Sequence, residues 1–273
     1  MNSFKKHSLF VGVATLACAL SAPAALLVEE TFTYPDGNLY NKSGGSGFSE
    51  NWWGGTNGTG VWTVNNSAAK ISGINSTWAV RGVSPAGTDF FFSVDLTVDT
   101  LATLASGSFV DALILRVGGL TFYVGAQFTQ WGYGIRATIG SDNYSLTPSQ
   151  AIKTTGTTYT IVGHYTFSES AGQAAISLWL NPENETSPAL HEVSPTATST
   201  GLDRITLQRY DSDKGGTTTT IFDNIRIGTE WGDVAPSPVP EPEAWTAIAG
   251  AVLFVLASLR CLRCLRRGSR CRT

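Results

Sequence analysis

The sequence predicts an all-β protein, a two-sheet antiparallel jelly-roll sandwich, flanked by an N-terminal signal peptide and a single C-terminal transmembrane helix. Only 14% of its 273 residues are charged and 42% are hydrophobic, which excludes a disordered chain and a coiled coil. Residues 25–233 show almost no helical periodicity, but about a dozen short β-rich runs separated by Gly, Asn, Asp and Thr. Strands in that number pack best as two sheets, because one core is then buried and few edges stay exposed.

The clearest strand pattern is Asp89–Asp99, where apolar and mostly polar residues alternate, so that one face is buried and the other is wet. Residues 109–117 have a nearly continuous apolar centre, which predicts a strand covered on both faces. The pair Gly118-Gly119 then predicts a tight hairpin into residues 120–124. Further strands are expected over residues 26–32, 131–139, 159–167, 173–180, 203–208 and 219–227.

The net charge of −3 is divided unevenly along the chain. Residues 25–240 carry ten Lys and Arg against nineteen Asp and Glu, a net charge of −9. Nucleic-acid phosphates and anionic lipid repel such a body, so no nucleic-acid partner is expected. Six arginines lie within residues 260–273, where a basic cluster beside an apolar run indicates a membrane-side stop.

Residues 1–24 have the pattern of a secretory signal peptide: two lysines, an apolar run over 9–20, and small residues at Ala22 and Ala24. Signal peptidase is therefore expected to cleave after Ala24. One alternative is a first membrane span, for which the apolar run is short. Another is a lipid-modified Cys18, which the preceding residues fit poorly.

The other end of the chain divides into three segments. Residues 234–243 form a proline-rich linker that can continue neither a strand nor a helix. Residues 244–259 carry no charge and predict a transmembrane helix, which at about 1.5 Å per residue is short for a span. The arginines of residues 260–273 extend its reach by snorkelling, so the protein is expected to contact the membrane through this helix before processing.

The linker contains Val239-Pro240-Glu241-Pro242. The order of this motif, a short apolar helix and a terminal arginine cluster resembles the PEP-CTERM sorting signal of Gram-negative bacteria. The resemblance implies cleavage near the motif by an exosortase, a membrane-embedded transpeptidase or protease that releases or re-anchors the ectodomain. It also implies an association with exopolysaccharide production. The alternative is an ordinary C-terminal anchor with its basic end in the cytoplasm.

All four cysteines, Cys18, Cys261, Cys264 and Cys271, lie in the end segments, so the body is expected to contain no disulfide. The spacing Cys261-x-x-Cys264 has neither the nearby histidine nor the second cysteine pair that a zinc site needs. The body must therefore be held together by its hydrophobic core.

The two ends of the body, residues 28–37 with 44–48 and residues 222–231, are similar to the first and last strands of concanavalin and laminin-G-like sandwiches in secreted bacterial proteins. The resemblance implies that these strands lie side by side, so that the ends of the body meet. It also implies binding of carbohydrate or protein more often than catalysis.

Asp223 shares a face of the last predicted strand with three isoleucines, so the pleat places a carboxylate in an apolar setting. A buried carboxylate needs a cation or several hydrogen-bond donors. One hypothesis is a structural calcium ion, held by Asp223, by Glu29 or Glu30 on the adjacent first strand, and by backbone carbonyls. The alternative places Asp223 at the sheet margin, where it caps backbone amides or pairs with an arginine.

Two tryptophans are the candidate ligand-binding residues. Trp52 lies in a Gly- and Asn-rich loop beside Trp53, and Trp131 lies next to glutamines. Exposed aromatics on loops mark binding sites, and the C–H face of a sugar packs well on an indole. Trp53 could instead plug the end of the sandwich. Three further tryptophans fall in strand patterns and are expected in the core: Trp62, Trp78 and Trp179.

Catalytic motifs are not recognisable in the sequence. It has neither the Glu-x-Asp-x-x-Glu strand of laminarinase-type glycosidases nor a Gly-x-Ser-x-Gly elbow. The protein is therefore expected not to be an enzyme, but an exported envelope or extracellular-matrix protein that binds polysaccharide through its sandwich. Alternatives are a secreted glycan-active hydrolase or lyase, and a purely structural surface protein.

Overall fold

The computed structural model describes residues 25–56, 62–71, 76–84, 87–100, 109–129, 132–147, 155–211 and 218–235. The predicted signal peptide with Ala22 and Ala24 lies outside this part of the chain, as do the motif Val239-Pro240-Glu241-Pro242, the apolar segment and the tail. Within the described part, no helix is long and apolar enough to cross a membrane.

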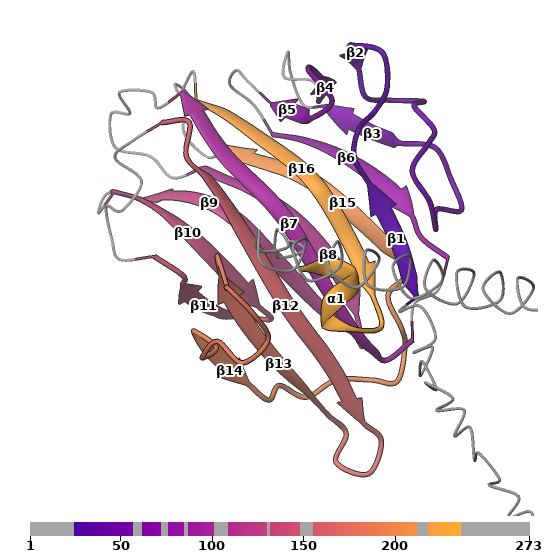
Figure 1. The fold of residues 1–273 in the computed structure, drawn as a ribbon, viewed down its shortest axis with the longest axis vertical. Helices are drawn as coiled ribbons and strands as arrows, with labels where there is room; N and C mark the ends of the chain where they lie inside the picture. The colour runs from indigo at the N-terminus through magenta and orange to yellow at the C-terminus, as the bar shows by residue number, and fades with distance from the viewer. Residues whose placement is uncertain are drawn as a thin grey trace, which may run out of the picture.

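The described residues form two antiparallel sheets packed face to face, which confirms the predicted β-sandwich (Figure 1). One sheet has nine strands in the order β14-β13-β12-β7-β16-β5-β4-β2, with β1 also paired to β16. The other has seven strands in the order β11-β10-β9-β8-β15-β6-β3. The sixteen strands of the described residues exceed the number expected, because short strands at the sheet margins add to the long central ones.

The nine-stranded sheet consists of β1 (Leu26–Glu30), β2 (Gly37–Asn38), β4 (Thr63–Val64), β5 (Ala69–Ile71), β7 (Asp89–Thr100), β12 (Thr158–Ser168), β13 (Gln173–Leu180), β14 (His191–Val193) and β16 (Thr219–Gly228). The seven-stranded sheet consists of β3 (Trp53–Thr56), β6 (Thr77–Gly82), β8 (Phe109–Val117), β9 (Leu120–Thr129), β10 (Gly132–Ile139), β11 (Asp142–Ser145) and β15 (Arg204–Asp211). A short helix, α1 (Trp231–Val234), follows β16.

Alternation along the strands turns one face of each sheet toward a common core. In β7, Phe92, Val94 and Leu96 point inward and are almost fully buried. The outer side of β7 is only partly wet, because Phe91 packs with Trp179 in a separate apolar cluster that also contains a residue of α1. The prediction of one wet face for this strand is therefore corrected at its N-terminal part.

The continuous apolar run of strand β8 is divided between the two faces of its sheet. Leu113 and Leu115 enter the core, whereas Ala112 and Ile114 alternate to the outer face of the seven-stranded sheet, where they line open hollows. Residues 112–115 are all at most 4% exposed, so the centre of this strand is buried on both faces, as predicted. On the outer face, side chains of the two neighbouring strands flank Ile114.

The hairpin predicted at Gly118-Gly119 is confirmed. Strands β8 and β9 pair as far as Val117 and Leu120, and the two glycines between them have φ values of 60° and 74°. A two-residue turn that matches the twist of the strands needs positive φ at both positions, which glycine adopts without strain.

The first and last strands pair, with Leu26 of β1 opposite Gly228 of β16, as the family resemblance implied. The Thr229 N–H also donates to the Ala25 carbonyl at 3.4 Å. Helix α1 then packs on the outer face of the nine-stranded sheet, where Ser93 Oγ donates to the Val234 carbonyl at 2.8 Å. Both ends of the body therefore leave from the same end of this sheet.

Candidate functional site

The two neighbouring indoles Trp52 and Trp53 lie on opposite sides of the chain as it enters β3. Trp52 is fully buried; its Nε1 donates to Glu30 Oε2 at 3.0 Å and its ring stacks on Phe32. The prediction that Trp52 binds a ligand is therefore wrong, because the alternation at the start of β3 turns this ring into the core. Trp53 points outward and is 47% exposed. Trp131 lies outside the described residues.

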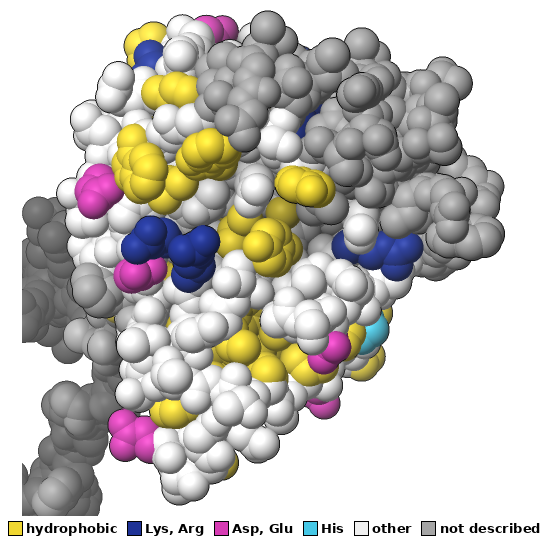
Figure 2. All heavy atoms as spheres, turned by 180° about the vertical axis from the view of Figure 1, so that it is seen from behind, with side chains coloured by type: hydrophobic (Ala, Val, Ile, Leu, Met, Phe, Trp, Pro, Cys, Tyr) yellow, Lys and Arg dark blue, Asp and Glu magenta, His cyan; other side chains and the backbone are white. Residues whose placement is uncertain are grey.

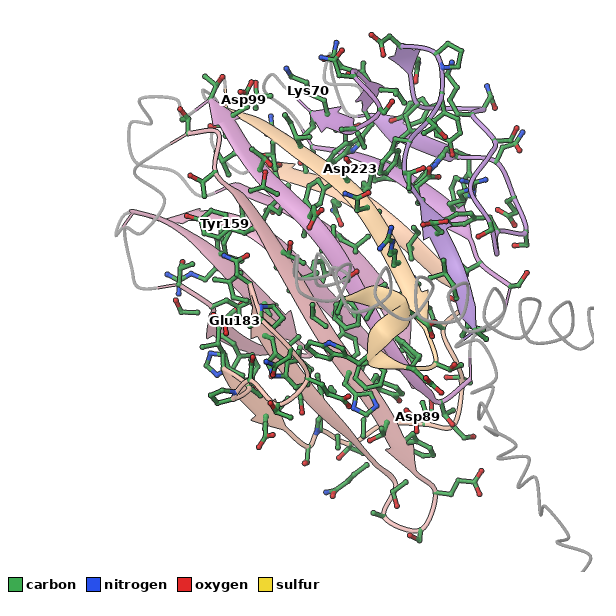
Figure 3. All side chains as sticks on the ribbon, viewed as in Figure 1. Lys70, Asp89, Asp99, Tyr159, Glu183 and Asp223 are labelled. Atoms are coloured by element: carbon green, nitrogen blue, oxygen red, sulfur yellow. The ribbon has the colours of Figure 1, made fainter. Side chains whose placement is uncertain are left out.

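The predicted face of Asp223 is wrong because β16 contains a β-bulge. Asp223 pairs with Asp95 of β7, but Arg226 pairs with Ser93, so β16 holds one extra residue at this point. Asn224 adopts a φ of 48° there. The bulge reverses the alternation: the two isoleucines after it enter the core, whereas Asp223 stays half-buried on the outer face (Figure 3).

The two glutamates proposed to complete a calcium site have other partners. Glu30 is buried and accepts a hydrogen bond from Arg81 Nη1 at 2.5 Å, while Glu29 lies 3.3 Å from Arg226 Nη2. Among the described residues, no group of three His, Cys, Asp or Glu is arranged to hold a metal. Calcium binding at Asp223 stays a prediction.

Electrostatics around Asp223 disfavour its charge. Burial raises its pKa from 3.8 to about 6; the N–H that Asn224 donates to it at 2.7 Å opposes this shift, and the charge of Asp95 adds to it. The Asp95 carboxylate accepts two hydrogen bonds, from Thr160 Oγ1 at 2.6 Å and from Asn224 Nδ2 at 2.8 Å. Two carboxylates at paired positions therefore repel each other when both are ionised.

Replacing Asp223 by Asn is expected to stabilise the fold above pH 6 and to leave it unchanged in acid. Because the folded state binds this proton more tightly than the unfolded chain, the free energy of unfolding falls as the pH rises from 3.8 to about 6. The variant removes that loss, a gain of about 1 kcal/mol after screening of a partly exposed group. Urea unfolding in EDTA at several pH values measures it, and equal midpoints at pH 8 would contradict the expectation.

The same variant tests the calcium prediction. If Asp223 is a calcium ligand, added calcium raises the melting temperature of the wild-type protein and has no such effect on Asp223→Asn, because a bound ion stabilises only the folded state. If calcium shifts neither protein, the ion hypothesis is wrong.

The outer face of the seven-stranded sheet presents a continuous row of side chains across all of its strands. The antiparallel register places one residue of each strand opposite one residue of the next, so their side chains are neighbours on that face. The row runs from an indole at the β3 edge, through an apolar centre, to a phenol and polar groups at the β11 edge. It consists of Trp53, Val80, Thr206, Ile114, Tyr123, Thr138 and Asn143.

The adjacent row alternates large side chains with very small ones. Gly55 leaves room for the indole of Trp78, whose Cζ2 lies 2.4 Å from where a Cβ at residue 55 would stand. Beyond Gln208, the paired positions on the next two strands carry Ala112 and Gly125, whose small size leaves space above the backbone of the sheet. Small residues between large ones create hollows on a pleated surface.

Three hollows open on this face and adjoin one another. The first holds about 290 Å³ between Trp53 and Tyr123, and the second holds about 400 Å³ and shares Tyr123 and Gln208 with the first. The third holds about 350 Å³ beside the β8–β9 turn and shares Arg116 and Arg204 with the first. We call these three neighbouring hollows the groove.

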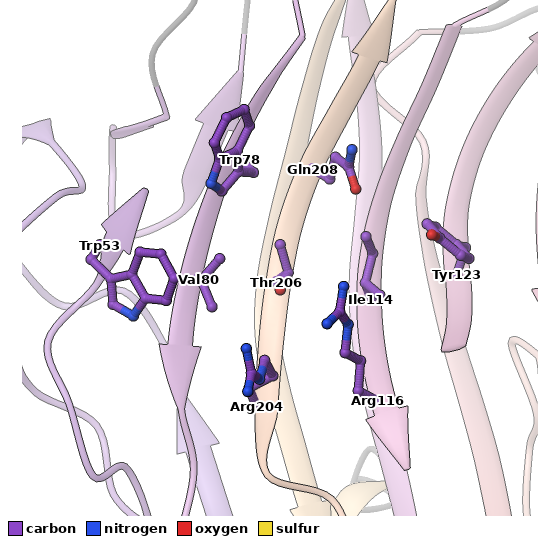
Figure 4. A pocket seen from close by; sticks show the side chains of 9 residues that line it. All are labelled: Trp53, Trp78, Val80, Ile114, Arg116, Tyr123, Arg204, Thr206 and Gln208. Atoms are coloured by element: carbon purple, nitrogen blue, oxygen red, sulfur yellow. The ribbon is translucent and has the colours of Figure 1, made fainter. Parts of the chain in front are cut away.

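The pictures show how the lining of the groove is arranged. In Figure 2, which views the molecule from behind, dark blue side chains lie beside yellow ones on this face. Figure 4 shows Trp53 and Trp78 on one side of the first hollow, Tyr123 on the other, and Arg116 with Arg204 at one end.

The two tryptophans of the groove differ in how far they are exposed and in what contacts them. Trp53 Nε1 donates to Glu50 Oε2 at 2.9 Å, which leaves the ring face free. Trp78 was expected in the core, but it is half-buried and lines the groove, so that prediction is wrong. Trp62 is fully buried, as expected.

The chemistry available in the groove is stacking and hydrogen bonding. Indole and phenol rings accept the C–H faces of flat, polar molecules, while guanidinium and amide groups donate to oxygen atoms. The polar lining residues are Arg116, Thr121, Tyr123, Gln127, Thr138, Asn143, Thr200, Asp203, Arg204, Thr206, Gln208 and Tyr210. Aromatic faces beside many donors suit a ligand rich in hydroxyl groups.

One signal in the sequence could have located this site. Along β15, Arg204, Thr206, Gln208 and Tyr210 alternate with residues that point into the sandwich. A strand whose outward positions carry large polar and aromatic groups is unusual for a merely solvated face, which favours small and charged residues. Their neighbours on β6, β8 and β9 depend on the register, which the sequence does not show.

Comparisons with known proteins show the fold. No family model and no curated protein matches the sequence. A solved structure from work on endo-acting O-glycanases of the human gut microbiota has a TM-score of 0.50 at 8% identity, covering 76% of this chain and 100% of that one. A beta-1,3-glucanase from Mycobacterium marinum has a TM-score of 0.47 at 11% identity, covering 75% and 99%. The alginate lyase vAL-1 from Chlorella virus has a TM-score of 0.42 at 9% identity, covering 67% and 93%.

These comparisons correct the expectation that the protein is not an enzyme. A structure that shares this sandwich, with a TM-score of 0.50, comes from work on endo-acting O-glycanases. The lack of a recognised motif in the sequence therefore does not exclude catalysis.

Proposed function

We propose that the protein binds a polysaccharide chain along the groove of the seven-stranded sheet. The observation that carries this proposal is the pair of outward indoles, Trp53 and Trp78, beside the amide of Gln208 and the phenol of Tyr123 in one hollow. The C–H face of a sugar ring packs on an indole, while its hydroxyl groups exchange hydrogen bonds with amide and phenol groups. The three neighbouring hollows of the groove together offer space for several consecutive sugar units.

The binding proposal is tested by removing the indoles one at a time. Trp53→Ala and Trp78→Ala are each expected to weaken binding about tenfold or more, because a central aromatic contact typically contributes about 1.4 kcal/mol or more. Binding is measured by a glycan array and then by calorimetry on the best polysaccharide. Trp231→Ala is the matched control, because it removes an indole from the opposite face of the sandwich. Equal losses in all three variants would contradict binding at the groove.

Cleavage of the bound chain is the second candidate function. The observation that favours it is that Tyr123 lines the same hollow as Arg116 and Arg204. A tyrosine can transfer a proton, and a guanidinium group stabilises negative charge that develops during a reaction. Incubation with polysaccharides, followed by assays of reducing ends and of unsaturated products, tests this. Tyr123→Phe is expected to abolish cleavage while binding persists; cleavage that survives in this variant would contradict the role.

We also propose that the sandwich acts outside the cytoplasm, delivered by the signal peptide and by the PEP-CTERM motif Val239-Pro240-Glu241-Pro242, with exosortase as the processing partner. This proposal is supported by the order of three features in the sequence: the motif comes first, the apolar segment follows, and the arginines come last. Intact mass of the protein from membrane and medium fractions tests it. A species that starts near Ala25 and ends near Pro240 supports processing, whereas a retained tail contradicts it.

A further inference from the structure

Two arginines lie side by side at one end of the groove. Arg116 of β8 and Arg204 of β15 are directly opposed in the register of the sheet, and both project onto its outer face (Figure 4). Like charges at directly opposed positions destabilise a sheet unless something compensates them. The fold therefore carries a local electrostatic cost at this point.

The described residues offer little compensation for this pair. The Arg204 side chain contacts only its chain neighbour Asp203, through Nε at 3.3 Å and Nη2 at 3.5 Å. Both side chains are exposed and both contacts are long, so this ion pair contributes little. The Arg116 side chain is exposed and makes no hydrogen bond or ion pair with any residue that the structure describes. Most of the guanidinium donors at this end of the groove are therefore free for a ligand.

Three other arginines of the body pair with carboxylates. Arg81 binds Glu30, Arg209 binds Asp111 and Arg226 binds Glu29. Because residues 25–240 have a net charge of −9, a surface where arginines outnumber carboxylates is exceptional for this protein. Asp203 is the sole carboxylate among the residues that line the three hollows in the described part of the chain.

The arginine pair faces hollow space on two sides. On one side is the hollow that contains Trp53 and Trp78; on the other is the hollow of the β8–β9 turn, which Thr121 also lines. An anionic group held by the arginines would therefore belong to a molecule that continues over the indoles. Guanidinium groups bind planar carboxylates and sulfate oxygens through paired hydrogen bonds.

We propose that Arg116 and Arg204 form an anion subsite that makes the groove selective for acidic polysaccharides, holding a carboxylate or sulfate group of one sugar unit. This inference rests on the proposed polysaccharide binding and names its substrate class. The positive charge of the two arginines favours acidic over neutral polysaccharides, whereas the indoles contact the sugar rings of both kinds of chain.

The test compares matched polymers that differ only in charge. Polygalacturonate is compared with its methyl ester for carboxylate, and dextran sulfate with dextran for sulfate, by affinity electrophoresis and calorimetry. The wild-type protein is expected to bind at least one acidic polymer about tenfold more tightly than its neutral counterpart, and added salt should weaken this preference. The arm that shows the preference identifies the anionic group.

The double variant Arg116→Gln with Arg204→Gln is expected to lose the preference, so that it binds the acidic and the neutral polymer of each pair about equally. Arg226→Gln is the matched control, because that arginine lies on the nine-stranded sheet and pairs with Glu29. The melting temperature of the double variant should not fall, since both groove arginines are solvent-accessible and their removal relieves the repulsion between two opposed like charges. If the double variant keeps the preference, or if the wild-type protein shows none, the anion subsite is wrong although the groove still binds glycan. If no polymer binds the wild-type protein, the proposed function itself is wrong.

Discussion

Replacing Asp111 by Ala is expected to destabilise the sandwich by about 3 to 5 kcal/mol, because it leaves the charge of Arg209 buried without its carboxylate. Asp111 accepts from Arg209 Nε at 2.6 Å and Nη2 at 2.5 Å, and both side chains are at most 2% exposed. Asp111 also accepts from Thr220 Oγ1 of the other sheet. Loss of the Asp111 carboxylate therefore also removes a hydrogen bond between the two sheets. Urea unfolding followed by fluorescence measures the change.

Two further variants keep this prediction falsifiable. Asp111→Leu with Arg209→Met is expected to recover most of the stability, because replacing both partners of a buried pair by apolar groups removes the unpaired charge. Asp99→Asn, which breaks the exposed pair of Asp99 with Lys70 at 3.6 Å, is expected to change the free energy of unfolding by less than about 0.5 kcal/mol. Equal effects of Asp111→Ala and Asp99→Asn would show that the buried pair is unimportant.

Replacing Glu30 by Gln is expected to destabilise the fold by about 3 kcal/mol and to loosen the segment that leads into β3. The Glu30 carboxylate accepts from Arg81 Nη1, Tyr34 hydroxyl and Trp52 Nε1, and from the Phe32 backbone N–H. Burial, together with the hydrogen bond to this carboxylate, raises the pKa of the Tyr34 phenol far above its usual value. A neutral amide leaves the buried Arg81 charge uncompensated.

The Glu30 prediction has a readout in the groove. Arg81 also donates to the carbonyls of Gly44 at 2.7 Å and Glu50 at 2.8 Å, so the network fixes the chain just before Trp53. Hydrogen exchange over residues 31–52 should therefore become faster in Glu30→Gln. Tyr34→Phe removes a neutral hydroxyl that donates to Glu30 and accepts from Arg81 Nη1 at 2.9 Å, but it leaves the Glu30 charge in place. It is the control and is expected to lose about 1 to 2 kcal/mol, less than Glu30→Gln. Slow exchange in Glu30→Gln would contradict the proposed role of the network.

The sequence carried enough information to predict the sandwich, its main strands and the pairing of its ends. The period-two alternation in β7 predicts a strand, and the double glycine before β9 predicts a tight turn. Both predictions depend only on residues that are close together in the sequence. Trp62 was assigned to the core correctly for the same reason. Such features need no knowledge of which strand lies next to which.

The candidate site was largely missed because it depends on register and on single-residue irregularities. One bulge at Asn224 reverses the alternation that had placed Asp223 among isoleucines. The order of Trp52 and Trp53 relative to the start of β3 decides which indole is buried. Arg116 and Arg204 are 88 residues apart in the sequence and meet only because β8 and β15 pair.

The position of β16 has a mechanical consequence. Its first half pairs with β5 and β7, and its second half pairs with β1 and β7, so neighbours hold it on both sides along most of its length. A pull on the chain after α1, opposed by a polymer held on the far sheet, would act along the axis of this strand. Sliding β16 requires many backbone hydrogen bonds to break together, whereas peeling breaks them one at a time. The pairing of β16 is therefore suited to withstand tension applied between the C-terminal end of the described body and the opposite sheet.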